Sequence, residues 1–117
     1  MPLVLNAPPS AGRALMALCH AHPHFSGIEG LIHATRRAAA VVGVDSGPLH
    51  LAAALRRPGV AIFGPTDPAI NGPYGGSITV LRAPGAETSY KREDSIAPSM
   101  REISPQQVWS RLKEVLP

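Results

Sequence analysis

The 117-residue sequence holds a single cysteine, few aromatic residues and no long apolar run. The lone Cys19 excludes an internal disulfide and is typical of proteins in a reducing compartment. Aromatic residues make up 4% of the chain, so the core must be built from alanine, valine, leucine and isoleucine. No apolar stretch is long enough to span a bilayer. The start, Met1-Pro2-Leu3, lacks the basic region of a signal peptide.

Charge is scarce as well: charged residues make up 16% of the chain, and the net charge is +3. No basic run is interleaved with aromatic residues, so we expect no nucleic-acid partner. The mild positive balance suits an anionic small ligand or an acceptor at a membrane surface. Together with the single cysteine and the start of the sequence, this predicts a cytoplasmic protein, with a peripheral position at a membrane surface as an alternative. A chain of this length can bury one modest core.

What the sequence does contain is a βαβ pattern near its middle. Apolar runs at 40–44 and 60–63 flank a helix pattern of small residues over 48–56. Each apolar run stops at a polar turn, and in a parallel sheet such turns meet at the edge where ligands bind. The first turn is Asp45-Ser46-Gly47-Pro48 and the second is Gly64-Pro65-Thr66-Asp67-Pro68. We expect the two turns to face one crevice.

The first turn has the chemistry of an anion site. A helix N-terminus offers unpaired N–H groups and a partial positive charge. Gly47 would let a phosphate approach the backbone closely, and Ser46 can cap the helix or donate its hydroxyl to the phosphate. Pro48 suits the first turn, where no N–H donor is needed. The same residues also make an ordinary capped helix start, and that interpretation stays open.

Side chains next to the two turns complete a predicted substrate-binding set. Asp45 would repel a phosphate beside it, so it is better suited to accept hydrogen bonds from sugar hydroxyls. His50 lies one turn into the helix, where its ring could point back at the same anion. The predicted set is Asp45, Ser46, Gly47, Pro48, His50, Thr66 and Asp67.

Periodicity and punctuation residues predict the other elements. We expect strands at 3–6, 40–44, 60–63 and 78–81, and helices at 10–21, 28–38, 48–56 and 105–115. Ser104 should cap the last helix, whose apolar stripe is Val108, Leu112 and Val115. Loops are expected at 22–26, 68–76 and 82–101. With no internal repeat, residues 1–117 are expected to form a single domain.

Two local features have alternative interpretations. His20, His22 and His24 alternate as metal ligands on a strand can, but Pro23 interrupts them and no Cys, Asp or Glu lies nearby. A solvated loop is therefore the prediction there, with no metal. Tyr74 could stack on a base or a sugar at the rim of the crevice, or anchor its own loop.

The middle of the sequence resembles a known family. The resemblance is carried by Val44-Asp45-Ser46-Gly47-Pro48-Leu49-His50 and the residues up to Leu55, by Pro58, and by Phe63-Gly64-Pro65-Thr66-Asp67-Pro68. It is similar to the C-terminal domain of family 9 glycosyltransferases, the ADP-heptose:lipopolysaccharide heptosyltransferases and their relatives. The tail from Lys91 to Val108 is also similar, and the resemblance covers most of the chain from about Gly27 onward. It implies an α/β, GT-B architecture, in which two Rossmann-like domains face each other across a cleft.

The resemblance also implies roles for the predicted site. The residue matching Asp45 contacts hydroxyls of the donor sugar, and those matching Ser46 and Gly47 hold the diphosphate. The histidine matching His50 lies near the diphosphate, and the turn matching Thr66 and Asp67 lies beside the same donor. The family inverts the anomeric centre and needs no metal for the diphosphate, so no cofactor is implied. The implied donor is ADP-heptose or a similar nucleotide sugar, and the implied acceptor is lipopolysaccharide core.

The sequence departs from the family pattern in three ways. It is long enough for only one of the two domains. We therefore expect no catalytic base here, because the family supplies it from its N-terminal half, and no catalytic residue is assigned. Residues 1–5 resemble the second strand of the domain, so a lysine that contacts phosphate on the first strand has no counterpart. The glutamate that holds the ribose matches a position near Ser10, and no acidic residue occurs before Glu29.

Two functions remain open from the sequence. One is the donor-binding domain of an inverting glycosyltransferase of lipopolysaccharide core biosynthesis, inactive as an isolated chain. The other is a truncated, non-catalytic domain that self-associates, with a homodimer covering an exposed strand edge or apolar surface. Titration with ADP, UDP and GDP discriminates between them.

Overall fold

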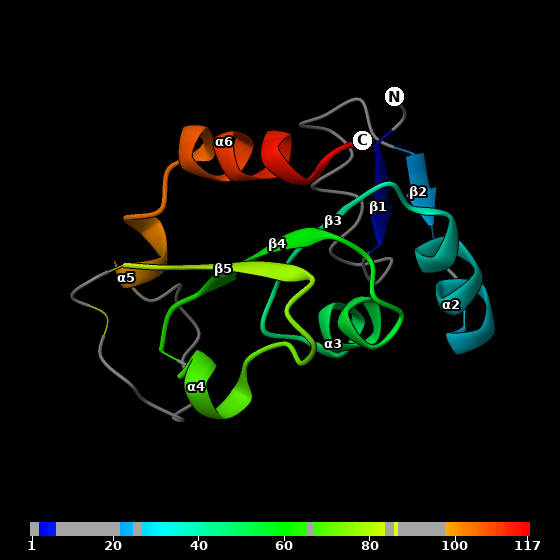
Figure 1. Cartoon of the computed structure of the whole chain (residues 1–117), viewed down its shortest axis with the longest axis horizontal. Helices are drawn as coiled ribbons and strands as arrows, with labels where there is room; N and C mark the ends of the chain where they lie inside the picture. The colour runs from blue at the N-terminus through cyan, green and yellow to red at the C-terminus, as the bar shows by residue number, and fades with distance from the viewer. Residues whose placement is uncertain (1–2, 7–21, 25–26, 66, 84–85, 87–97) are drawn as a thin grey trace. The chain divides into compact units, whose positions relative to one another are not determined.

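The computed structural model describes residues 3–6, 22–24, 27–65, 67–83, 86 and 98–117 (Figure 1). They fall into two compact units, Met1–Leu31 and Ile32–Pro117. The helix predicted at 10–21, which includes Cys19, and the predicted binding role of Thr66 lie outside the described residues.

The first unit contains a two-stranded parallel sheet of β1 (Val4–Asn6) and β2 (His22–His24). Val4 lies opposite His22, and His22 N donates to Leu3 O at 2.8 Å. The predicted first strand is confirmed, whereas the loop predicted at 22–26 is wrong where β2 forms. An edge strand tolerates Pro23, because the N–H that proline lacks need not join the ladder.

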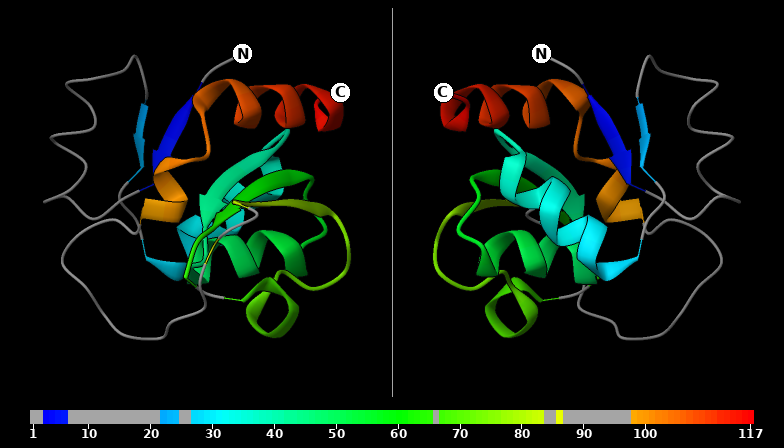
Figure 2. Two further views of the ribbon diagram at one scale, coloured as in Figure 1. Left: turned by 90° about the vertical axis from the view of Figure 1, so that its left-hand side faces the viewer. Right: turned by 90° about the vertical axis from the view of Figure 1, so that its right-hand side faces the viewer.

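The second unit is built on a three-stranded parallel sheet in the order β3-β4-β5. These strands are β3 (Val41–Val44), β4 (Gly59–Phe63) and β5 (Ile78–Arg82). The helices α3 (Gly47–Ala54) and α6 (Pro105–Val115) lie on opposite faces of this sheet (Figures 1 and 2). The predicted βαβ unit is confirmed, with strand ends shifted by a residue.

The core of this unit lies between α3 and the sheet. It is formed by Leu49, Ala53, Ala61, Phe63 and Ile78. Small side chains on α3 let the helix lie close to the strands, and Ala53 is only 3% exposed. Phe63 supplies the largest fully buried side chain, in a chain with few aromatic residues.

A glycine is required at one point where two strands pair. A Cβ on Gly59 would lie 2.2 Å from Val41 O, which no side chain allows. Glycine at the first residue of β4 therefore permits the close pairing of β3 and β4.

The remaining helices follow their capping signals. Ser104 and Gln107 form a reciprocal capping box at the start of α6, with bonds of 3.1 Å and 2.7 Å. The predicted stripe of Val108, Leu112 and Val115 is half-buried. The helix α2 (Ile28–Arg37) confirms the prediction at 28–38.

Two short helices occupy segments that were expected to be loops. These are α4 (Pro68–Asn71) and α5 (Pro98–Arg101). The side chain of Asp67 caps α4 by accepting a hydrogen bond from Ala69 N at 2.9 Å, and Pro68 suits the first turn. Across the described parts of the chain, no helix has the length and apolar character needed to cross a membrane.

Candidate functional site

The two polar turns leave the sheet at the same edge. β3 and β4 are parallel neighbours, with Val44 opposite Ile62, so the turns that follow them lie at their common carboxyl end. β5 ends at this edge too, with Arg82 opposite Phe63. The shared edge is confirmed, whereas the expectation that the two turns face one crevice stays a prediction.

The N-terminus of α3 is open to solvent. Gly47 and Pro48 are exposed, and a Cβ on Gly47 would meet no atom within 4 Å. Ser46 occupies the N-cap position in extended conformation, but its side chain makes no capping hydrogen bond. The capping alternative is therefore wrong for this hydroxyl. The hydroxyl and the first-turn N–H groups of α3 are placed to meet an incoming anion.

Asp45 and His50 contact each other across this helix start. His50 Nε2 lies 2.9 Å from Asp45 Oδ1, and the two side chains are 42% and 23% exposed. A carboxylate can only accept, so Nε2 carries the proton and donates. The sequence predicts each residue as a ligand contact, and nothing in its spacing indicates the bond between them.

The second turn is held by the side chains of Asp67, within the turn, and of Arg82, at the end of β5. Asp67 Oδ1 accepts from Ala69 N and lies 4.0 Å from Arg82 Nη1. Arg82 Nε donates to Gly64 O at 2.9 Å, at the start of the same turn. Asp67 thus has a structural role in capping α4, and its binding role stays a prediction.

Sequence reasoning missed Arg82 as part of this edge. Its guanidinium reaches both ends of the second turn and is mostly shielded, with 21% of the side chain exposed. The available signal is its position: a cationic residue ends a strand at the edge where two polar turns meet. That signal indicates proximity to the turns but not which atoms the guanidinium contacts.

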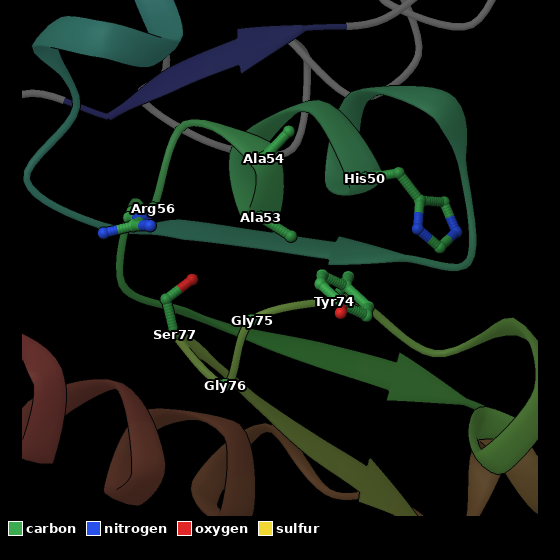
Figure 3. Close-up of a pocket in the computed structure, with 8 residues that line it drawn as sticks. All are labelled: His50, Ala53, Ala54, Arg56, Tyr74, Gly75, Gly76 and Ser77. Carbon is green, nitrogen blue, oxygen red and sulfur yellow. The ribbon is translucent and has the colours of Figure 1, made fainter.

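An open hollow of about 740 Å³ lies beside α3 (Figure 3). It is lined by His50, Ala53, Ala54, Arg56, Tyr74, Gly75, Gly76 and Ser77. His50 and Tyr74 stand toward one end of it and Arg56 toward the other (Figure 3). Of the predicted set, His50 alone lines it among the described residues. The hollow therefore runs along α3 from His50 to Arg56 and adjoins the predicted set through His50.

Tyr74 is 92% exposed, so the alternative that it anchors its loop by packing is wrong. Gly75 and Gly76 follow it with φ of 99° and 78°, values that side chains rarely adopt. These glycines shape the segment that leads from the exposed ring back to β5. The ring is left free to stack on a ligand.

The other end of the hollow is formed by the C-terminus of α3. Arg56 N donates to Ala53 O and Arg57 N donates to Ala52 O, each at 3.0 Å, which is a Schellman motif. Arg56 takes the left-handed position of that motif with φ of 56°, where glycine is usual. The helix predicted over 48–56 therefore ends earlier, because Arg56 leaves helical conformation.

The chain is similar to proteins of a known family. The model of glycosyltransferase family 9 (heptosyltransferase) matches residues 8–100. The chain is 48% identical over 62 residues to lipopolysaccharide heptosyltransferase 1 of Escherichia coli O18:K1:H7. The matched segment covers 53% of this chain and 19% of that protein.

Two solved structures from E. coli are also similar. The ADP-heptose lps heptosyltransferase II superposes with a TM-score of 0.83 at 26% identity, over 97% of this chain and 36% of that one. The heptosyltransferase WaaC with ADP gives a TM-score of 0.59 at 38% identity, over 74% of this chain and 28% of that one.

The chain thus spans about a fifth of the curated relative and about a third of the solved ones. The expected α/β class, a parallel sheet with flanking helices as in GT-B heptosyltransferases, is confirmed by the likeness. Since the family match runs over residues 8–100 and so takes in most of the sequence, this chain belongs to glycosyltransferase family 9, the heptosyltransferase family.

Proposed function

We propose that this chain binds the nucleotide-sugar donor of a heptosyltransferase of lipopolysaccharide core biosynthesis. The observation that carries the proposal is the open start of α3, where Gly47 is uncovered and the Ser46 side chain makes no capping bond. A diphosphate seated there would accept hydrogen bonds from first-turn N–H groups. ADP is the favoured nucleotide, because the similar WaaC of E. coli has been solved with ADP.

Each of the surrounding residues would contact a different part of the donor. Asp45 has a second carboxylate oxygen that can accept hydrogen bonds from the hydroxyls of a heptose-like sugar. His50 and the helix start would stabilise the negative charge that develops on the departing diphosphate. Tyr74, exposed at the rim of the hollow, would stack on the base or the sugar. No catalytic base is assigned on this chain, so we expect it to transfer no sugar by itself. We also expect it to bind the donor only weakly.

Calorimetric titration with ADP, UDP and GDP tests the proposal. We expect saturable binding, strongest for ADP, that Gly47→Val abolishes by filling the space where the phosphate approaches. Gly43→Ala on β3 is the matched control, because its added Cβ meets Leu49 Cδ1 at an ordinary 3.4 Å. Absence of binding to all three nucleotides contradicts the proposal, and sugar transfer by the isolated chain contradicts its predicted inactivity.

One observation favours the second candidate, a self-associating domain. Val42 and Val44 on β3 are 47% and 44% exposed, and β4 is the one strand paired with β3 in the described sheet. A second copy could cover this edge. A stable dimer in sedimentation analysis, together with no nucleotide binding, would support this candidate over the first.

A further inference from the structure

We propose that Asp45 acts on the diphosphate through His50, as a positioning residue, in addition to any contact with the sugar. This inference rests on the proposed function of the same site. The observation behind it is the 2.9 Å contact between His50 Nε2 and Asp45 Oδ1. The contact joins residues on either side of Ser46 and Gly47, so it frames the turn where the diphosphate would sit.

The contact decides which ring nitrogen can serve an anion. Because the carboxylate accepts, Nε2 of His50 holds its proton, and a neutral ring then has a bare lone pair on Nδ1. A bare nitrogen repels a phosphate oxygen. The ring therefore donates to a phosphate only after Nδ1 gains a proton, and the resulting imidazolium bridges Asp45 and the diphosphate.

Diphosphate binding is thus coupled to the uptake of one proton from solvent by Nδ1. Arg56 and Tyr74 are the other charged or titratable side chains that line the hollow with His50 in the described structure. A guanidinium has no acceptor atom and a phenol has no basic nitrogen, so neither is a site for an added proton. At the neighbouring turn, Asp67 faces Arg82. His50 is therefore the group to which a proton uptake would be assigned.

Asp45 also restricts the orientation of the ring. The His50 side chain is 42% exposed, and an exposed ring without a partner samples several rotamers. The bond to Asp45 holds one of them before the ligand arrives. Removal of Asp45 should therefore weaken diphosphate binding, even though the loss of a negative charge beside the anion would by itself strengthen it.

If Asp45 only contacted the sugar, its removal would change ADP affinity in the opposite direction. ADP lacks the transferred sugar, so such a residue contributes no favourable contact to ADP affinity. Removal of its carboxylate would relieve repulsion and tighten ADP binding. The proposal instead predicts that Asp45→Ala weakens ADP binding by about tenfold, the loss of one charge-assisted hydrogen bond. Asp45→Asn should lie between, because its amide oxygen still accepts from Nε2 but carries no charge.

A double-mutant cycle on the full chain separates action through His50 from independent action. In the His50→Gln background, Asp45→Ala should cause no further loss of ADP affinity. Glu114→Gln is the matched control for the loss of one carboxylate, since Glu114 lies on α6, on the opposite face of the sheet from α3. The control should bind ADP like the unaltered chain.

Two further readouts follow the proton itself. Ring ¹⁵N spectra, with His50 identified by the His50→Gln variant, should show the Nε2–H form without ligand and a second proton on Nδ1 with ADP. Calorimetry in buffers of different ionisation enthalpy, at about pH 8 and so above the second pKa of a phosphate near 6, should report proton uptake. That uptake should vanish in His50→Gln.

The outcomes distinguish this inference from the proposed function. If the unaltered chain binds no nucleoside diphosphate, the proposed function and this inference both fall. If ADP binds but Asp45→Ala tightens it, or the two substitutions act additively, or no proton is taken up, the proposed function stands and this inference is overturned.

Discussion

The two turns at the carboxyl edge of the sheet use similar residues in different ways. At the first turn, Ser46 holds the N-cap position of α3 without a side-chain cap, and Gly47 is uncovered. At the second, Asp67 caps α4 and Arg82 holds Gly64 O. Ser46 and Gly47 of the first turn remain available to a ligand, whereas Gly64 and Asp67 of the second are bonded within the chain. A polar turn at the carboxyl edge of a parallel sheet can therefore stabilise the chain as well as await a ligand.

The sharpest way to break this comparison is to give the first turn the chemistry of the second. Ser46→Asp puts a capping carboxylate at the start of α3, where it favours the helix but repels a diphosphate. We expect ADP affinity to fall about 100-fold, from like-charge repulsion, while thermal stability holds or rises. Calorimetry and thermal unfolding measure the two effects. Ser46→Ala is the control, and unchanged ADP affinity in Ser46→Asp would contradict the role of the first turn.

The next largest effect is expected at Arg82. Arg82→Ala removes the donor to Gly64 O in a mostly shielded position, so the free energy of unfolding should drop by about 1–2 kcal/mol. Urea unfolding measures this change. Arg82→Lys keeps the charge but not the planar geometry and should recover only part of the loss. If Arg82→Ala lowered ADP affinity as much as Ser46→Asp, the contrast between the two turns would disappear.

Asp67→Ala removes the N-cap side chain of α4 in the same turn. Loss of the bond from Ala69 N should lower stability by about 1 kcal/mol, as for other N-cap truncations. Asp67→Asn retains a capping oxygen and should behave nearly as the unaltered chain in urea unfolding. A large loss of ADP binding in both variants would show that Asp67 binds ligand as well, as the sequence predicts.

The smallest effect concerns the other end of α3. Arg56→Gly relieves the left-handed strain at φ of 56° and should raise stability by about 0.5–1 kcal/mol. Arg56→Ala keeps the strain while it removes the long side chain, so it separates the backbone effect from the side-chain effect. Urea unfolding that showed no gain for Arg56→Gly over Arg56→Ala would contradict the assignment of strain.

Much of the fold could be predicted from local patterns in the sequence. The apolar runs around the Asp45 turn indicate the βαβ unit, and Ser104 with Gln107 indicates the start of α6. The short elements β2 and α4 were missed for a physical reason. A three-residue strand such as His22–His24 exists only because β1 pairs with it, and α4 exists because Asp67 turns its side chain back onto Ala69.

The sequence by itself determined where the chain becomes polar, and so which residues stand at the binding edge of a parallel sheet. Apolar periodicity and Gly-Pro punctuation are local properties, and they act within a few residues of one another. Only the tertiary structure decided how those polar groups are used. Arg82 reaches Gly64 because the register of β4 and β5 places Arg82 opposite Phe63. The bond between Asp45 and His50 depends on the rotamers that the two side chains adopt at the start of α3.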